Sequence, residues 1–101
     1  MYQLRTYTIN NSKNAQIYFD VHWSKHISSL KKFGIETCAV FRTMSEQDKQ
    51  QVIAIVKCAA GEDIVSLNDQ YMASQEFKDD MRGFDMTAIE NVETVDLIKK
   101  V

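Results

Sequence analysis

The first third of the chain shows a short strand pattern followed by a long helical one. Residues 1–9 are rich in aromatic and β-branched side chains, which is typical of a β-strand. A polar break follows, in which Ser12 is the expected N-cap, and apolar residues then recur at helical spacing to about Phe33. Gly34 suits the position just after a helix. The pattern therefore predicts a strand and then one long helix.

The remaining pattern predicts a hairpin, two shorter helical segments and a last strand. Apolar residues at 35–43 and 50–57 predict strands, and the polar connector 44–49 between them favours a hairpin. Acidic residues after Gly61 favour a helix start, because they oppose the positive end of the helix dipole. The further elements are expected at residues 64–72, from residue 74 to just before Gly83, and 92–99.

This order gives the fold class. Strand, helix, strand, strand, helix and strand form the α+β, ferredoxin-like βαββαβ plan. It predicts a four-stranded antiparallel sheet with the helices on one face. The chain contains no linker, low-complexity tract or repeat, so we expect a single domain over residues 1–101.

The third predicted strand indicates a partner. Residues 52–56 are apolar at every position, so both faces of this strand favour burial. The helices can cover only one face, and a second copy of the chain related by two-fold symmetry is the simplest cover for the other. We therefore expect a homodimer through the open sheet face. The alternative is a monomer whose outer sheet face is simply apolar.

Composition excludes several classes of partner. The 101 residues carry a formal net charge of −2, which gives no basis for expecting nucleic acid as a partner. An RNA-recognition module shares the element order, but residues 52–56 lack the aromatic side chains that stack on bases. No apolar run is long enough to span a membrane, and the first residues do not resemble a signal peptide. A cytoplasmic protein is the expectation.

Two histidines four residues apart are the first candidates for chemistry. At helical spacing His26 falls inside an apolar stripe with Phe19, Trp23 and Leu30, whereas His22 falls on its shoulder and is expected to be partly exposed. His26 can be a core histidine held by hydrogen bonds, or a pocket residue that acts as acid or base. A metal ligand is the weakest alternative, because HxxxH lacks a third ligand. We expect neither a metal nor a cofactor.

The other candidates lie on the first strand and the same helix. Arg5 and Tyr7 share one face of the strand. Arg5 can pair with an acidic residue, or anchor the carboxylate or enolate of a ligand with Tyr7 as a further donor. Trp23 can be a core anchor or an aromatic pocket wall. Elsewhere, Asp79, Asp80 and Asp85 are expected to form a solvated acidic rim. Cys38 and Cys58 are expected to be small buried residues, and a disulfide between them is the alternative.

Three segments resemble the NIPSNAP-like branch of the dimeric α+β barrel superfamily. They are residues 2–8 (YQLRTYT), 26–35 (HISSLKKFGI) and 72–77 (MASQEF), although proline near residue 75, found in many relatives, is missing. The resemblance implies a homodimeric barrel made of two ferredoxin-like sheets. It also implies pocket roles for Arg5, Tyr7, Trp23 and His26. Relatives include cofactor-independent oxygenases, haem-degrading enzymes, isomerases and proteins without an assigned activity.

Two functions follow from these residues. The first is an oxygenase- or isomerase-like enzyme with a pocket between the long helix and the sheet, acting on a small anionic or phenolic substrate. His26 is then the catalytic acid or base, and Arg5, Tyr7, His22 and Trp23 contact the substrate. The alternative is a non-catalytic binding or stress-associated homodimer, which predicts that protein groups occupy both ring nitrogens of His26.

Overall fold

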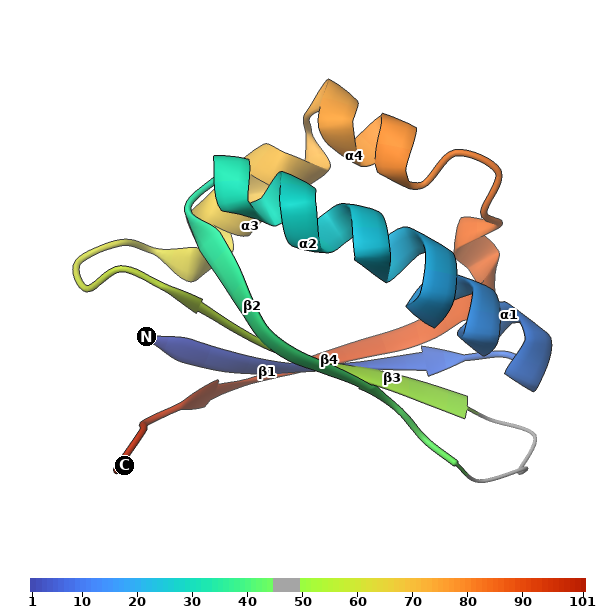
Figure 1. The fold of residues 1–101 in the computed structure, drawn as a ribbon, viewed down its shortest axis with the longest axis horizontal. Helices are drawn as coiled ribbons and strands as arrows, with labels where there is room; N and C mark the ends of the chain where they lie inside the picture. The colour runs from blue at the N-terminus through green and yellow to red at the C-terminus, as the bar shows by residue number, and fades with distance from the viewer. Residues whose placement is uncertain (45–49) are drawn as a thin grey trace.

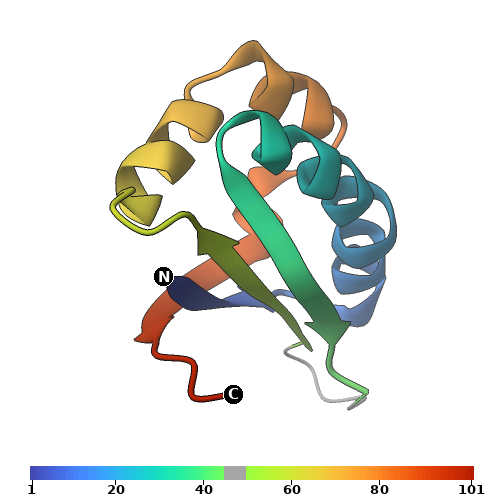
Figure 2. The same cartoon turned by 60° about the vertical axis from the view of Figure 1, so that its left-hand side comes forward.

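The computed structural model describes residues 1–44 and 50–101 and has two layers (Figure 1). A four-stranded sheet in the order β2-β3-β1-β4 forms one layer, and each neighbouring pair of strands is antiparallel. All helices lie on one face of this sheet (Figures 1 and 2). The predicted ferredoxin-like fold class is therefore confirmed. The strands are β1 (Tyr2–Ile9), β2 (Ile35–Arg42), β3 (Gln50–Cys58) and β4 (Ile89–Leu97).

The helical layer is built from two runs of helix. The predicted long helix is continuous in space but is divided into α1 (Ser12–Ile17), a π-helical segment (Tyr18–His22) and α2 (Trp23–Lys32). The second run contains α3 (Ile64–Met72) and α4 (Gln75–Asp80), and both pack against α2. A 3₁₀ turn, Met86–Ala88, leads into β4. This last strand therefore begins three residues earlier than the sequence pattern indicated.

Side-chain caps fix the starts of the helices. The cap of α1 is Asn11 rather than the expected Ser12: the Asn11 backbone is extended, and its side-chain Oδ1 accepts from the Asn14 N–H at 2.8 Å. Ser12 is instead the first helical residue. Asp63 caps α3 by accepting from the Val65 N–H at 3.1 Å, and Ser74 caps α4. Each cap satisfies an N–H group that has no partner within its helix.

The core lies between the helices and the inner face of the sheet. Val52, Ala54 and Val56 of β3 alternate toward the helices and are fully buried. Trp23 and Leu30 of α2 are buried in the same cluster. Burying a large apolar side chain contributes about 1.5–3 kcal/mol, so this layer supplies most of the stability of the fold.

The outer face of the sheet carries a band of apolar side chains that none of the described helices covers. In the strand register Leu4 stands opposite both Ile55 and Val95, and Phe41 stands opposite Ile53. Phe41 and Val95 are more than half exposed. We call this surface the outer sheet face; its apolar members are Leu4, Phe41, Ile53, Ile55, Val95 and Leu97.

The two cysteines differ in environment and are both free thiols. Cys58 is buried as expected, but Cys38 is exposed, because the register between β2 and β3 shifts around it and it lies on an edge strand. Most of the predicted connector 44–49 lies outside the described residues. Among the residues that are described, no helix has the length and apolar character needed to cross a membrane.

Replacing Asn11 by Ala should lower the free energy of unfolding by about 0.5–2 kcal/mol, because the Asn14 N–H then loses its acceptor. Urea denaturation followed by far-UV circular dichroism measures the change. The matched control is Ser12→Ala, which removes a hydroxyl from the neighbouring exposed position and should leave stability nearly unchanged. Equal losses in both variants would contradict Asn11 as the cap.

Candidate functional site

The π-helical segment changes which way the first histidine points. The Trp23 N–H bonds to the carbonyl of Tyr18, five residues back, so this turn contains more residues than an α-helical turn. His22 is consequently rotated inward and is only 3% exposed. The expectation of a partly exposed His22 was therefore wrong. Its Nδ1 donates to the backbone carbonyl of Asp80 at 2.7 Å, which ties the π-helical segment to the end of α4.

The second histidine lies in an aromatic cage. His26 is 4% exposed, stacks on Phe77 with an interplanar angle of 9°, and meets the edges of Trp23 and Tyr71. Burial lowers the pKa of His26 from 6.5 to about 4. The charge of Asp80 opposes this shift in pKa, and the positive charge of Arg5 adds to it. His26 is thus neutral at physiological pH.

A buried hydrogen-bond chain runs from this histidine to an acidic side chain. His26 Nδ1 bonds to the hydroxyl of Tyr71, and that hydroxyl donates to Asp80 Oδ2 at 2.6 Å. Burial, followed by the bond to Asp80, raises the pKa of Tyr71, so the phenol keeps its proton. Asp80 is itself buried, which corrects the expectation that it belongs to a solvated rim; Asp79 and Asp85 are exposed as expected.

Tyr71 and Asp80 are not among the site residues predicted from the sequence. A signal for Asp80 was present, because it lies on the same helical face as Phe77, three residues earlier, and beside the buried Met81. Tyr71 carried no comparable signal. Its helical spacing was equally compatible with a core aromatic residue.

Arg5 is buried without an acidic partner. It is 4% exposed, and its Nε donates to Gln3 Oε1 at 2.9 Å. Gln3 is in turn held by Asp96, with 3.4 Å between Gln3 Nε2 and Asp96 Oδ1. No ion pair of Arg5 occurs within residues 1–44 and 50–101. A buried arginine normally pairs with a carboxylate, so the free part of this guanidinium is unusual.

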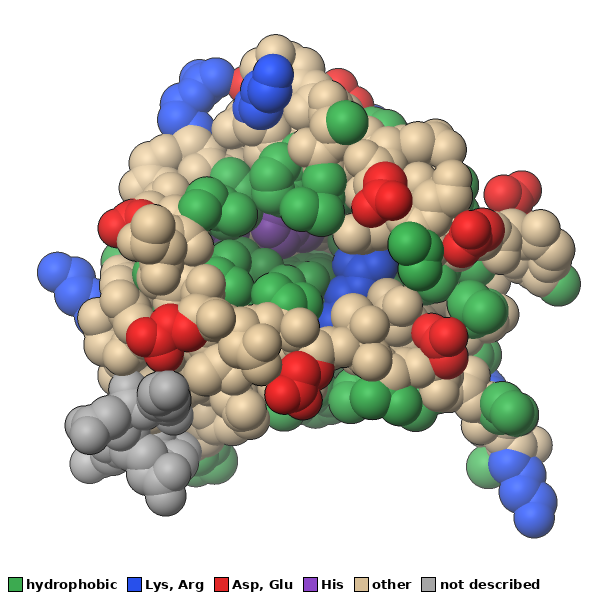
Figure 3. Space-filling model, turned by 180° about the vertical axis from the view of Figure 1, so that it is seen from behind, with side chains coloured by type: hydrophobic (Ala, Val, Ile, Leu, Met, Phe, Trp, Pro, Cys, Tyr) green, Lys and Arg blue, Asp and Glu red, His purple; other side chains and the backbone are tan. Residues whose placement is uncertain are grey.

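Arg5 lines a cavity of about 320 Å³ between the inner face of β1 and β4 and helix α3. Figure 3 shows this side of the molecule hollowed, with hydrophobic side chains around the opening and basic and histidine side chains visible in its depth. We call it the Arg5 cavity. Its lining is formed by Gln3, Arg5, Tyr7, Val65, Asn68, Asp69, Met72, Val92 and Thr94.

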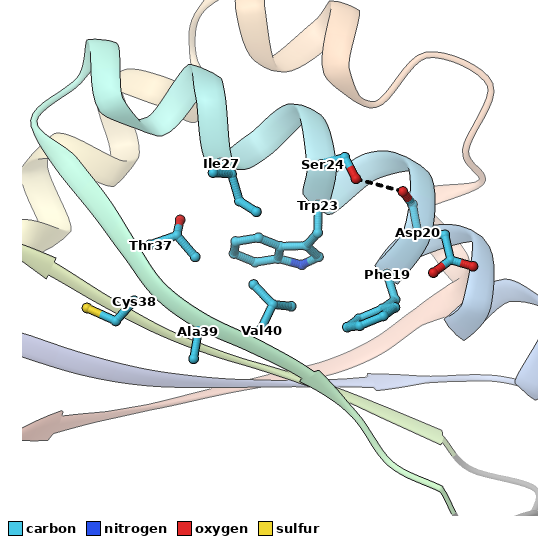
Figure 4. Close-up of a pocket in the computed structure, with 9 residues that line it drawn as sticks. All are labelled: Phe19, Asp20, Trp23, Ser24, Ile27, Thr37, Cys38, Ala39 and Val40. Atoms are coloured by element: carbon cyan, nitrogen blue, oxygen red, sulfur yellow. Dashed lines mark hydrogen bonds between the residues drawn. The ribbon is translucent and has the colours of Figure 1, made fainter.

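A second cavity of about 360 Å³ lies between α2 and β2 (Figure 4). Trp23 lies at its centre, with Phe19 and Ile27 from the helical side and Val40 from the strand. The Trp23 ring also meets the Tyr7 ring at a centroid distance of 5.9 Å. Tyr7 lines the first cavity and Trp23 lines the second, so the contact between their rings joins the walls of the two cavities.

The structure thus brings some of the predicted site residues together and separates others. Arg5 and Tyr7 share the Arg5 cavity, and Trp23 contacts Tyr7. His26 contacts Trp23 and is not among the residues that line the Arg5 cavity, and His22 binds the backbone of α4. Within the described part of the chain, no three His, Cys, Asp or Glu side chains are grouped as a metal site requires.

Comparison with solved structures places the fold among known proteins. A conserved protein of unknown function from Bacteroides thetaiotaomicron, described as a possible oxidoreductase, superposes with a TM-score of 0.56 at 14% identity, covering 95% of this chain and 96% of the other. Two proteins, each described as a "putative antibiotic biosynthesis monooxygenase", also match. The one from B. thetaiotaomicron has a TM-score of 0.52 at 10% identity and coverages of 99% and 90%. The one from Caulobacter crescentus has a TM-score of 0.53 at 10% identity and coverages of 97% and 91%.

At these identities the likeness shows the fold alone. No family model matches the chain, and no curated protein is detectably similar to it in sequence. The chain therefore shares a ferredoxin-like α+β fold with monooxygenase-like proteins, and its activity has to be argued from its own side chains.

Stability should depend on pH through His26. Below about pH 6.5 the unfolded histidine takes up a proton that the buried ring does not, so stability falls as the pH drops from about 6.5 to about 4. Between pH 7 and pH 4.5 this contribution is about 2–3 kcal/mol. Urea denaturation at both values, compared between the wild type and His26→Gln, isolates it from the titration of carboxylates. Identical pH dependence in the two proteins would contradict burial of a neutral His26.

Proposed function

We propose that the chain is a small oxygenase- or isomerase-like enzyme that acts, without a cofactor, on a small anionic or phenolic substrate in the Arg5 cavity. The observation that carries the proposal is Arg5: the residue is 4% exposed, lines a cavity and has no acidic partner among the described residues. The substrate would supply the missing negative charge.

The lining of the cavity defines the shape of such a substrate. Among the described residues, Arg5 makes its hydrogen bond through Nε, to Gln3, so the terminal amino groups remain for a carboxylate, enolate or phenolate oxygen. Val65, Met72 and Val92 form an apolar wall that suits a ring or an aliphatic body. A cavity of about 320 Å³ lies within the range of small-molecule sites. The helical wall of this cavity comes from α3, and none of its lining residues belongs to the long helix, so it differs from the pocket expected between the long helix and the sheet.

The chemistry that these groups support is proton abstraction. Neutral His26 can take a proton from the substrate, and Arg5 stabilises the oxyanion that remains. An anion near Arg5 also offsets the positive charge that helps to lower the pKa of His26, so substrate binding makes the base stronger. Returning the proton to another atom gives an isomerase, and transferring electrons from the anion to dioxygen gives an oxygenase. Both reactions share the first step.

The alternative of a non-catalytic binding or stress-associated homodimer is less well supported. It predicts protein partners for both nitrogens of His26, but hydrogen bonds within the described residues engage only Nδ1. One solved protein of the same fold is described as a possible oxidoreductase and two as a "putative antibiotic biosynthesis monooxygenase", which also supports an enzyme. The segments 2–8, 26–35 and 72–77 support a NIPSNAP-like affiliation.

Replacing Arg5 by Gln should weaken the binding of a small aromatic acid at least tenfold, because the carboxylate loses its cation. Salicylate, 3-hydroxybenzoate and 4-hydroxybenzoate serve as probes, with binding followed by titration in ¹⁵N–¹H NMR spectra. A tenfold change corresponds to about 1.4 kcal/mol. Methyl salicylate, which lacks the negative charge, should bind the wild type as weakly as salicylate binds Arg5→Gln.

The matched control for this prediction is Arg82→Gln. Arg82 is an exposed arginine that pairs with Asp79 on the protein surface, so its removal should leave probe binding unchanged. If Arg5→Gln folds and binds all three acids as tightly as the wild type, the anion site is wrong.

We further propose that the active form is a homodimer in which two copies pack through their outer sheet faces. Phe41 is 54% exposed and Val95 53% exposed, and they lie in one apolar band with the half-buried Ile53 and Ile55. The described part of the chain has no further helix to cover the band, and contiguous exposed apolar surface marks an interaction site. A two-fold arrangement lets the same band cover itself.

Multi-angle light scattering at micromolar concentration should give about 23 kDa, twice the chain mass of 11.7 kDa. Phe41→Glu should shift the protein toward the monomer, since dimerisation would bury a charge. Val21→Glu is the control, because Val21 is a similarly exposed apolar residue in the helical layer. A wild-type protein that remains at 11.7 kDa would refute the dimer.

A further inference from the structure

The donor and acceptor of each hydrogen bond in the His26–Tyr71–Asp80 chain follow from the carboxylate of Asp80. A carboxylate only accepts hydrogen bonds, so the hydroxyl proton of Tyr71 is committed to Asp80 Oδ2 at 2.6 Å. The Tyr71 oxygen is then left with lone pairs on the side that faces His26 Nδ1. His26 Nδ1 must therefore be the donor of that bond.

This direction fixes the tautomer of the imidazole. A neutral histidine carries one N–H group, so a proton on Nδ1 leaves Nε2 with a bare lone pair. Free imidazole side chains favour this tautomer less, and it becomes the main form where a partner accepts from Nδ1–H. No hydrogen bond to Nε2 occurs among the described residues. A histidine side chain is visible in the depth of the hollow, next to a basic one (Figure 3).

We propose that Tyr71 and Asp80 are positioning residues that keep the proton of His26 on Nδ1, so that Nε2 accepts a proton from a phenol or enol O–H of the substrate. In this step the substrate O–H bond breaks and an N–H bond forms at Nε2. The electron pair stays on the substrate oxygen, which becomes an oxyanion paired with Arg5. The inference rests on the proposed function, and it narrows the substrate class to molecules with an acidic hydroxyl.

Asp80 also balances the charge that this step creates. Protonated His26 is a buried cation, and the nearest carboxylate oxygen, Asp80 Oδ2, lies 3.9 Å from its Nδ1. Tyr71 lies between them and bonds to both. The same principle operates in catalytic triads. There an acidic group bonds to the histidine nitrogen that does not take the substrate proton, sets the tautomer and stabilises the imidazolium.

The tautomer can be measured directly, without substrate, from the ring-nitrogen signals of the two histidines in long-range ¹⁵N–¹H NMR spectra at pH 7. In the wild type we expect the proton of His26 on Nδ1. In Asp80→Ala the Tyr71 hydroxyl loses its acceptor and turns to donate to His26 Nδ1, so the proton should move to Nε2. Asp80→Asn, which preserves side-chain volume, should move part of the population in the same direction.

The chain offers two controls for this experiment. Asp79→Ala removes the neighbouring but exposed carboxylate and should leave His26 unchanged. His22 reports within the same spectrum, because its Nδ1 bonds to the backbone carbonyl of Asp80, which the substitution retains. A change at His22 would show that Asp80→Ala has disturbed the helix. In that case the shift of the His26 proton toward Nε2 is tested with Asp80→Asn instead.

The functional measurement compares salicylate with 2-methoxybenzoate, which cannot donate to Nε2. In both compounds the tested oxygen is adjacent to the carboxylate, so both groups can lie near Arg5. The wild type should bind the hydroxyl compound at least tenfold more tightly, and Asp80→Ala should bring the ratio close to one, whereas Asp79→Ala should retain it. A wild-type proton on Nε2, or a hydroxyl preference that survives the tautomer change, would overturn the proposal. Neither result would contradict the Arg5 anion site, which is tested separately by probe binding to Arg5→Gln. Conversely, failure of that binding test would not change the tautomer measured for His26.

Discussion

Polar groups buried between the helices and the sheet have to be satisfied by the elements around them, and this constraint organises the whole molecule. Leaving such a group unpaired in a low-dielectric interior costs about 1–3 kcal/mol. His22 is satisfied by the backbone of α4, and His26 by Tyr71. Within the described residues, Trp23 Nε1 and Thr37 Oγ1 are buried without a hydrogen-bond partner. The terminal amino groups of Arg5 and Nε2 of His26 make no hydrogen bond there either, and in the proposed function the substrate pairs with these two groups.

Asp80 is the residue on which this layer depends most. Its backbone carbonyl holds His22 of the π-helical segment, and its carboxylate holds Tyr71 of α3. One residue at the end of a six-residue helix therefore connects all the helical segments that surround His26. The same contacts place His26 in its aromatic cage, so the geometry of the candidate base and the packing of the helices cannot be separated.

Much of the fold could be predicted because it follows from local periodicity. The alternation in β1 placed Arg5 and Tyr7 on one face, and both line the same cavity. The angular position of His22 could not be obtained in this way, because a uniform 100° step per residue fails across the π-helical turn. Asp80 was predicted to be solvent-exposed for a different reason. A run of acidic residues is typical of a solvated surface, and only the contact with Tyr71 from another helix makes burial of one of them favourable.

The sequence by itself determined the order of the elements, the antiparallel ferredoxin-like plan, the apolar stripe that buries His26 and the shared face of Arg5 and Tyr7. These depend on the 3.6- and 2-residue periods, which are properties of neighbouring residues. The tertiary structure alone decided that Arg5 has a glutamine rather than an acid as its partner, and that His26 bonds to Tyr71 and Tyr71 to Asp80. These contacts join residues that are distant in the chain or lie on different elements, and no local pattern specifies which distant side chains meet.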